Sequence, residues 1–227
     1  MFGIHPLRLL LRMVLCIAAA LFVLWAVLAL WIDGPVSRTA AGLLIGILLG
    51  ALVGAVIWIR PFRRSLAVVV GLCIAVAAWW LTLSPANDRN WQPNVAHLPT
   101  ATLDGSLLTI NNVRSFRYGD NEADAEEHWI TATYDLDELV GFDIFFSFWG
   151  PRAYGHTIAS WEFSDGRHLA VSIETRKEVG ESYSALRGFF RQFELYYVVA
   201  EETDVVALRA NHRGEKVELY RIFTPEQ

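Results

Sequence analysis

The sequence predicts an α+β protein: three N-terminal membrane-spanning helices, then one domain with a mostly antiparallel β-sheet and a few helices. Three long apolar runs fill the first third of the chain, and short alternating segments separated by turn residues follow. Charge divides in the same way. The chain has 19 basic and 24 acidic residues. Residues 1–84 hold six of the basic residues and one of the acidic residues, and residues 85–227 hold the other 13 basic and 23 acidic residues. Such a division indicates two parts in two solvents.

The apolar runs cover residues 13–32, 40–59 and 65–83. Each is close to the roughly 20 residues that a helix needs to cross about 30 Å of hydrocarbon. The first run exceeds the roughly 7–15 residues of a signal-peptide core, and a second run follows at once, so we interpret it as a retained span. Residues 1–84 are therefore expected to form a membrane anchor in a lipid bilayer.

The arginines predict the orientation of these spans. Arg8 and Arg12 precede the first run and three more lie between the second and third runs, whereas the loop after the first run holds one. The positive-inside rule then places the N-terminus in the cytoplasm and residues 85–227 on the opposite side. In a bacterium, this describes a protein of the inner (cytoplasmic) membrane with a periplasmic C-terminal domain.

The second span carries a glycine at every fourth position: Gly42, Gly46, Gly50 and Gly54. This spacing puts a bare strip along one helix face, where a neighbouring helix can approach closely. We favour packing against the other two spans of the same chain over contact with a second copy.

Residues 85–104 are polar and marked by proline, which predicts a linker, and residues 105–227 predict the globular domain. Its first strands are expected at 106–118 and 129–136. The segment "FDIFFSFW" (142–149) is nearly all apolar, so we expect a central strand buried on both faces.

A hairpin follows, with Ser164-Asp165-Gly166 between two alternating runs. A three-residue loop needs its last residue in the left-handed region, where glycine belongs. That loop would pair Trp161 with Leu169 on an apolar face, and it would put His156 opposite Glu174 on the polar face. A two-residue turn on Asp165-Gly166 would instead set polar residues against apolar ones, so the first register is preferred.

After the hairpin we expect a helix at 182–193 with a serine cap, a strand at 194–200, a helix at 203–211 and a strand at 215–222. The last four residues, "TPEQ", have the pattern of a helix start, with proline at the first helical position. The domain is therefore expected to be incomplete at its C-terminus.

His156 and Glu174 are the candidate catalytic residues. A carboxylate beside an imidazole raises its basicity and fixes its tautomer, which are the requirements for a general base. The alternative for His156 is a hydrogen-bonded histidine at a strand end, and Glu174 and Arg176 could equally form a structural ion-pair network. Arg187 and Arg191, four residues apart on one expected helix face, are candidates to bind a phosphate or lipid head group together with Arg176, although such pairs usually only solvate a helix.

The sequence has no motif for a metal, cofactor, nucleic-acid or thiol site. The histidines have no metal-ligand spacing, so no metal is expected. There is no glycine-rich phosphate loop or other cofactor motif, and an acidic domain is a poor partner for nucleic acid. Both cysteines, Cys16 and Cys73, lie in the spans, so residues 85–227 hold no thiol.

The run from "SIETRKEVGESYSA" through "FFRQFELYYVVA" resembles the Lnb N-terminal periplasmic domain family, long described as a domain of unknown function, over roughly residues 105–223. The resemblance implies a cell-envelope domain similar to papain-like NlpC-type hydrolases and to the permuted lecithin–retinol acyltransferases. In the permuted order the histidine strand comes first and the nucleophilic cysteine later. His156 matches the family's histidine position, and an Asn-Cys-Thr segment is expected further downstream than this chain reaches.

Two functions follow as hypotheses. The first is a papain-like envelope enzyme for acyl transfer or hydrolysis on a lipid-linked substrate such as a lipoprotein or phospholipid, with its cysteine from a missing segment or a separate chain. The second is a non-catalytic membrane-anchored module for envelope assembly.

Overall fold

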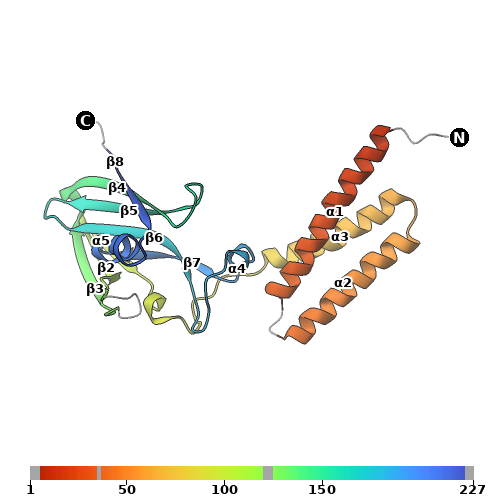
Figure 1. The fold of residues 1–227 in the computed structure, drawn as a ribbon. Coiled ribbons are helices and arrows are strands. Elements are labelled where there is room, and N and C mark those ends of the chain that lie inside the picture. Colours follow the sequence, from red (N-terminus) through yellow and green to blue (C-terminus); the bar gives the residue numbers. More distant parts are fainter. Residues whose placement is uncertain (1–5, 35–36, 120–124, 223–227) are drawn as a thin grey trace. The chain divides into compact units, whose positions relative to one another are not determined.

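The computed structural model describes residues 6–34, 37–119 and 125–222. The chain forms two compact units (Figure 1). The first comprises Met1–Asp88 and Tyr183–Phe193, and the second comprises Arg89–Ser182 and Glu194–Gln227. The expected helix start at 224–227 lies outside the described residues.

The first unit contains three helices that are long and apolar enough to cross a membrane: α1 (Pro6–Ile32), α2 (Arg38–Trp58) and α3 (Phe62–Leu81). The predicted spans are therefore confirmed as helices, with α1 beginning seven residues earlier than the apolar run. Their shared core includes Ala26 and Leu30 of α1, Leu52 of α2 and Cys73 of α3.

The glycine strip of α2 does not pack as predicted. A Cβ atom built on Gly42, Gly46 or Gly50 would meet nothing within 4 Å, and one built on Gly54 would meet only Trp58 of the same helix. Instead, α2 is buried along a different face, at Ala41, Leu48, Leu52 and Ala55. Leucine and alanine side chains fill the contact with the other spans, so the strip is left open in the described part of the chain.

The helix predicted at 182–193 is much shorter. Helix α4 covers Ala185–Phe189, begins at the cap residue Ser184 and ends before Arg191, whose φ is +44°. Gly188 lowers the helix propensity of this segment, and a left-handed residue terminates a helix. Residues Tyr183–Phe193 belong to the first unit although their neighbours in sequence belong to the second.

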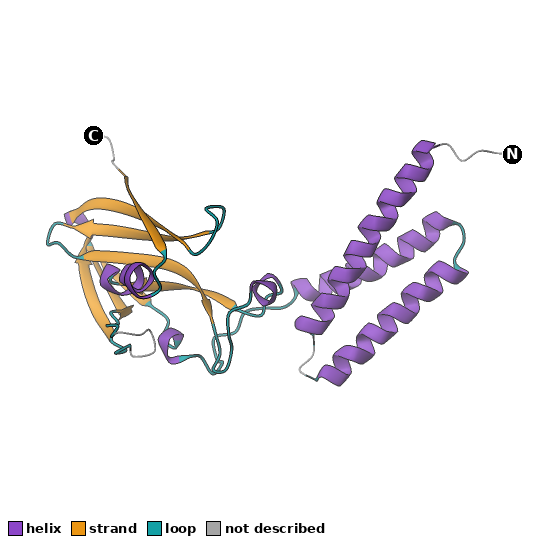
Figure 2. Ribbon diagram, in the orientation of Figure 1, coloured by secondary structure: helices purple, strands orange, loops and turns teal. Residues whose placement is uncertain are grey.

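The second unit is built around a mostly antiparallel sheet, whose strands are orange in Figure 2. The strand order is β1-β2-β7-β6-β5-β4-β8, and β3 pairs with β2. The one parallel pairing described is between β2 and β7. With three helices before it and short helices within it, the α+β prediction is confirmed. The strands are β1 (Thr100–Asp104), β2 (Leu107–Arg114), β3 (Trp129–Asp135), β4 (Leu139–Phe148), β5 (Gly155–Phe163), β6 (His168–Arg176), β7 (Glu194–Ala200) and β8 (Lys216–Ile222).

The linker predicted at 85–104 is shorter in the structure. Strand β1 and the 3₁₀ turn η1 (Pro93–Val95) both lie within that range. Trp91 and Val95 are buried in the core of the second unit, with Phe145 and Val198. Apolar residues within this proline-marked segment therefore pack on the sheet, and the second unit begins at Arg89.

The hairpin between β5 and β6 has the predicted register. Trp161 pairs with Leu169 and Glu162 with His168. Gly166 has φ +81°, and its N–H donates to the Phe163 carbonyl at 2.9 Å. The three-residue loop is confirmed.

Strand β4 lies between β5 and β8, so its inner position in the sheet is confirmed, but burial on both faces is wrong. Asp143, Phe145 and Ser147 are buried, whereas Phe142 and Phe146 on the other face are only half-buried. One face of the sheet is covered by helix α5 (Glu202–Ala207), whose Val205 joins the core around Phe145. In a second cluster, Ile110 and Val113 of β2 and Tyr134 of β3 pack with Phe163 of β5 and Leu169 of β6.

Candidate functional site

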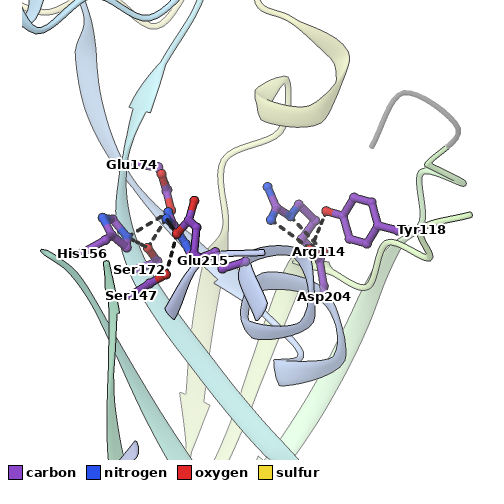
Figure 3. Close-up of polar contacts among 9 residues, drawn as sticks. Arg114, Tyr118, Ser147, His156, Ser172, Glu174, Asp204 and Glu215 are labelled. Carbon is purple, nitrogen blue, oxygen red and sulfur yellow. Dashed lines mark hydrogen bonds and ion pairs between the residues drawn. The ribbon is translucent and has the colours of Figure 1, made fainter. Parts of the chain in front are cut away.

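A polar cluster lies on the sheet face that carries helix α5. Alternate residues of a strand point to the same face, so β6 presents Ser172 and Glu174 together. The β5–β6 ladder places Ile158 opposite Ser172, and His156 precedes Ile158 by two residues in β5, on the same face. Figure 3 shows the side chains of His156, Ser172 and Glu174 converging, with Ser147 and Glu215 beside them.

The imidazole of His156 is held through one nitrogen. Its Nε2 lies 2.6 Å from Ser172 Oγ and 3.1 Å from Glu174 Oε1. Ser172 Oγ donates to Glu174 Oε1 at 2.9 Å. Because that bond uses the hydroxyl proton, Ser172 accepts from His156, which therefore carries its proton on Nε2. The lone pair then lies on Nδ1, and the ring is 17% exposed.

Arg209 ties this cluster together from the opposite side. It lies in the π-turn η4 (Leu208–His212) after α5, and its guanidinium donates to Glu174 Oε1 at 2.7 Å and to Glu215 Oε2 at 3.2 Å. Ser147, which pairs with His156 across β4 and β5, donates to Glu215. One connected network therefore surrounds the His156 imidazole, and its other members are Ser147, Ser172, Glu174, Arg209 and Glu215.

Charge in the network favours an ionised Glu174. Burial alone would raise the pKa of this carboxyl, but the hydrogen bond with His156 and the charge of Arg209 outweigh it and hold the pKa well below its usual range. A fixed carboxylate stabilises an imidazolium and orients the neutral ring. Chemically, the cluster is suited to accepting a proton at Nδ1 of His156.

Tyr196 pairs with Glu174 across β6 and β7. It is buried, its hydroxyl has no hydrogen-bond partner among the described residues, and burial raises its pKa. The hydroxyl therefore stays protonated at neutral pH and keeps its capacity to donate a hydrogen bond.

A second ionic cluster lies near the first (Figure 3). The Arg114 guanidinium makes two hydrogen bonds to Asp204, at 2.8 and 2.9 Å, and the Tyr118 hydroxyl donates to the same carboxylate at 2.8 Å. Asp204 is fully buried and Arg114 nearly so. This cluster joins β2 to α5, and its burial indicates a structural role.

The three arginines predicted to bind substrate have contacts of their own. Arg176 is 3% exposed, donates to the Val95 and Ala96 carbonyls and stacks on the Trp91 ring. Arg187 lies within α4, but Arg191 lies beyond its end, so the expected shared helix face does not form. The structure brings together His156 and Glu174.

Sequence reasoning missed four members of the network: Ser147, Ser172, Arg209 and Glu215. Ser172 shares the period-2 face of Glu174, and Ser147 is, with Asp143, one of two polar side chains in the mainly apolar strand β4, so both left a signal. Arg209 left no such signal, because it lies in the short, irregular π-helix η4 rather than in a regular helix or strand. In the described ranges, no three His, Cys, Asp or Glu side chains gather as metal ligands.

Comparison with known proteins gives one match. Residues 125–227 match the family model of the Lnb N-terminal periplasmic domain. No curated protein and no solved structure matches the chain. The matched region contains the hairpin, His156, Glu174 and Arg209, and it follows three candidate membrane-spanning helices, so residues 125–227 are similar to the Lnb N-terminal periplasmic domain.

Proposed function

We propose that this chain supplies the general-base half of a papain-like cell-envelope enzyme that catalyses acyl transfer or hydrolysis on a lipid-linked substrate. The observation that carries the proposal is the fixed imidazole. Ser172 and Glu174 hold His156 through Nε2, which leaves Nδ1 as the basic nitrogen. A nucleophile placed against Nδ1 would be deprotonated there, and Glu174 would stabilise the imidazolium that forms.

The nucleophile would come from outside these 227 residues. Cys16 and Cys73 are carried by α1 and α3, and residues 85–227 contain no cysteine. A segment with an Asn-Cys-Thr sequence, in a longer form of the protein or in a separate chain, is the partner that the family resemblance favours. A lipoprotein or phospholipid substrate agrees with a domain tethered to a bilayer.

The proposed location is the bacterial inner membrane, with a cytoplasmic N-terminus and a periplasmic second unit. The arginine distribution supports this orientation. The family match to a periplasmic domain agrees with it.

A non-catalytic envelope module remains the second candidate, because one sheet face exposes adjacent apolar side chains. Ile173 pairs with Tyr197, and Leu195 lies two residues before Tyr197 on β7. All three are more than half exposed. Exposed apolar patches of this kind mark protein interaction surfaces.

The two functions can be separated in cells that lack the chain and are complemented with variants, by mass spectrometry of lipoprotein N-terminal acylation. Under the enzyme proposal, His156→Ala abolishes the chain-dependent acyl change, and added imidazole partly restores it. Glu174→Gln weakens the change, because the ring loses its orienting carboxylate. Glu162→Gln, in the same hairpin, is the control.

A different pattern would favour the module. Full acylation with His156→Ala, together with loss of the envelope phenotype in Tyr197→Asp, contradicts a base at His156. Membrane levels of each variant must equal those of the wild type for either result to count.

A further inference from the structure

The segment Tyr183–Phe193 combines a buried half with an exposed apolar half. Phe190 and Phe193 are 2% and 7% exposed, whereas Tyr183, Leu186 and Phe189 are 62%, 57% and 65% exposed. Leu186 and Phe189 are three residues apart in α4, so they lie on one side of the helix. Large apolar side chains are rarely left in water in such a group.

This segment is bonded to the ends of two membrane-spanning helices. The Arg191 guanidinium donates to the carbonyls of Trp80 and Leu83, at 3.3 and 3.1 Å, and lies 4.1 Å from the Trp80 ring centroid. Gln192 donates to Asp33, the residue that follows α1, at 2.8 Å. The Trp80 indole donates to the same carboxylate at 2.6 Å.

These contacts fix the depth of the segment relative to a bilayer. When α1 and α3 span the hydrocarbon, their C-terminal ends lie at a membrane–water interface. Tryptophan and arginine are among the residues that anchor helices at that depth. An apolar helix face beside them meets lipid head groups and the first acyl carbons rather than bulk water.

We propose that Tyr183–Phe193 is an interfacial anchor that inserts Leu186 and Phe189 into the outer lipid leaflet. The occupant of the exposed apolar face is lipid, not protein. In sequence, the anchor lies between β6, which carries Glu174, and β7. The proposal does not depend on any reaction at His156.

Photo-crosslinking in the full chain tests this. The chain, with p-benzoylphenylalanine in place of Phe189, is reconstituted into vesicles of phosphatidylethanolamine and phosphatidylglycerol, irradiated, and analysed by mass spectrometry. The expected result is phospholipid adducts at position 189. The same amino acid in place of Leu103, which is 62% exposed in β1, is the matched control and should give none.

Each other outcome overturns the proposal. Absence of adducts at position 189 would mean that the side chain lies in water. An adduct to a second copy of the chain would mean that a protein covers this face. Equal lipid adducts at positions 189 and 103 would mean that the labelling reports no specific insertion. Because position 189 is exposed and tolerates a larger aromatic ring, the variant keeps the fold, which its circular dichroism spectrum would verify.

Discussion

At the scale of single residues, Glu174 makes the stability of the protein depend on pH. Its folded pKa lies below the ordinary value of 4.5, because the contacts with His156 and Arg209 outweigh the effect of burial. The stabilisation is therefore fully present above about pH 4.5 and is lost as the pH falls further. In Glu174→Gln this loss is absent, so the thermal midpoint should fall less steeply with acid than in the wild type.

The measurement is thermal unfolding of the full chain in detergent, followed by near-ultraviolet circular dichroism between pH 7 and pH 3. At pH 7, Glu174→Gln should cost about 1–3 kcal/mol, because charge-assisted hydrogen bonds are lost. Glu127→Gln, at an exposed position in the loop before β3, serves as the control and should retain the wild-type acid slope. Identical slopes in wild type and Glu174→Gln would contradict the assignment.

Removal of the Tyr196 hydroxyl, unlike the Glu174 substitution, is not expected to lower the free energy of unfolding. Its buried hydroxyl has no partner among the described residues, and an unpaired buried polar group costs roughly 1–3 kcal/mol. Tyr196→Phe should therefore leave the free energy of unfolding unchanged or raise it by up to about 1 kcal/mol. Tyr118→Phe, which loses a 2.8 Å bond to Asp204, should lower it in the same unfolding assay. A clear loss of stability in Tyr196→Phe would show that its hydroxyl is hydrogen-bonded.

At the scale of elements, the parts that local sequence determines were predictable. The β5–β6 register follows from an alternating pattern and from one glycine that must adopt a positive φ. The spans follow from length and apolar composition. Two contacts could not be predicted in this way: that of Arg209 with Glu174 and that of Arg114 with Asp204. Each joins elements that are far apart in sequence, so no local pattern indicates it.

The packing of the glycine strip of α2 also could not be predicted from local sequence. That the strip faces no other described helix of the chain can be tested by substitution. Gly46→Leu adds a side chain where a Cβ meets nothing within 4 Å, so the bundle should keep its thermal midpoint in detergent. Ala29→Leu also creates a leucine, at a position that is fully buried in α1, and overpacking there should cost about 1–3 kcal/mol. A lower midpoint for Gly46→Leu would indicate that another chain occupies the strip.

At the scale of the whole molecule, the sequence predicts two parts but not where the chain divides. Composition changes near residue 84, and the first segment of the first unit ends at Asp88. The return of Tyr183–Phe193 to the first unit could not be predicted, because it rests on contacts such as Gln192 with Asp33, 159 residues apart. A short apolar helix within a sheet domain is equally compatible with packing on its own core.

Membrane orientation is the last prediction. The Arg12 guanidinium lies 5.7 Å from the Phe62 ring centroid, so the start of α1 lies beside the start of α3. That end of the bundle also carries Arg63, and the positive-inside rule places it in the cytoplasm. A phosphatase reporter that is active only outside the cytoplasm should therefore work when fused after Gln227 and fail when fused after Arg63. A fusion after Asp33, at the opposite end of α1, should also be active, whereas the reverse pattern at all three sites would show that the N-terminus faces outward.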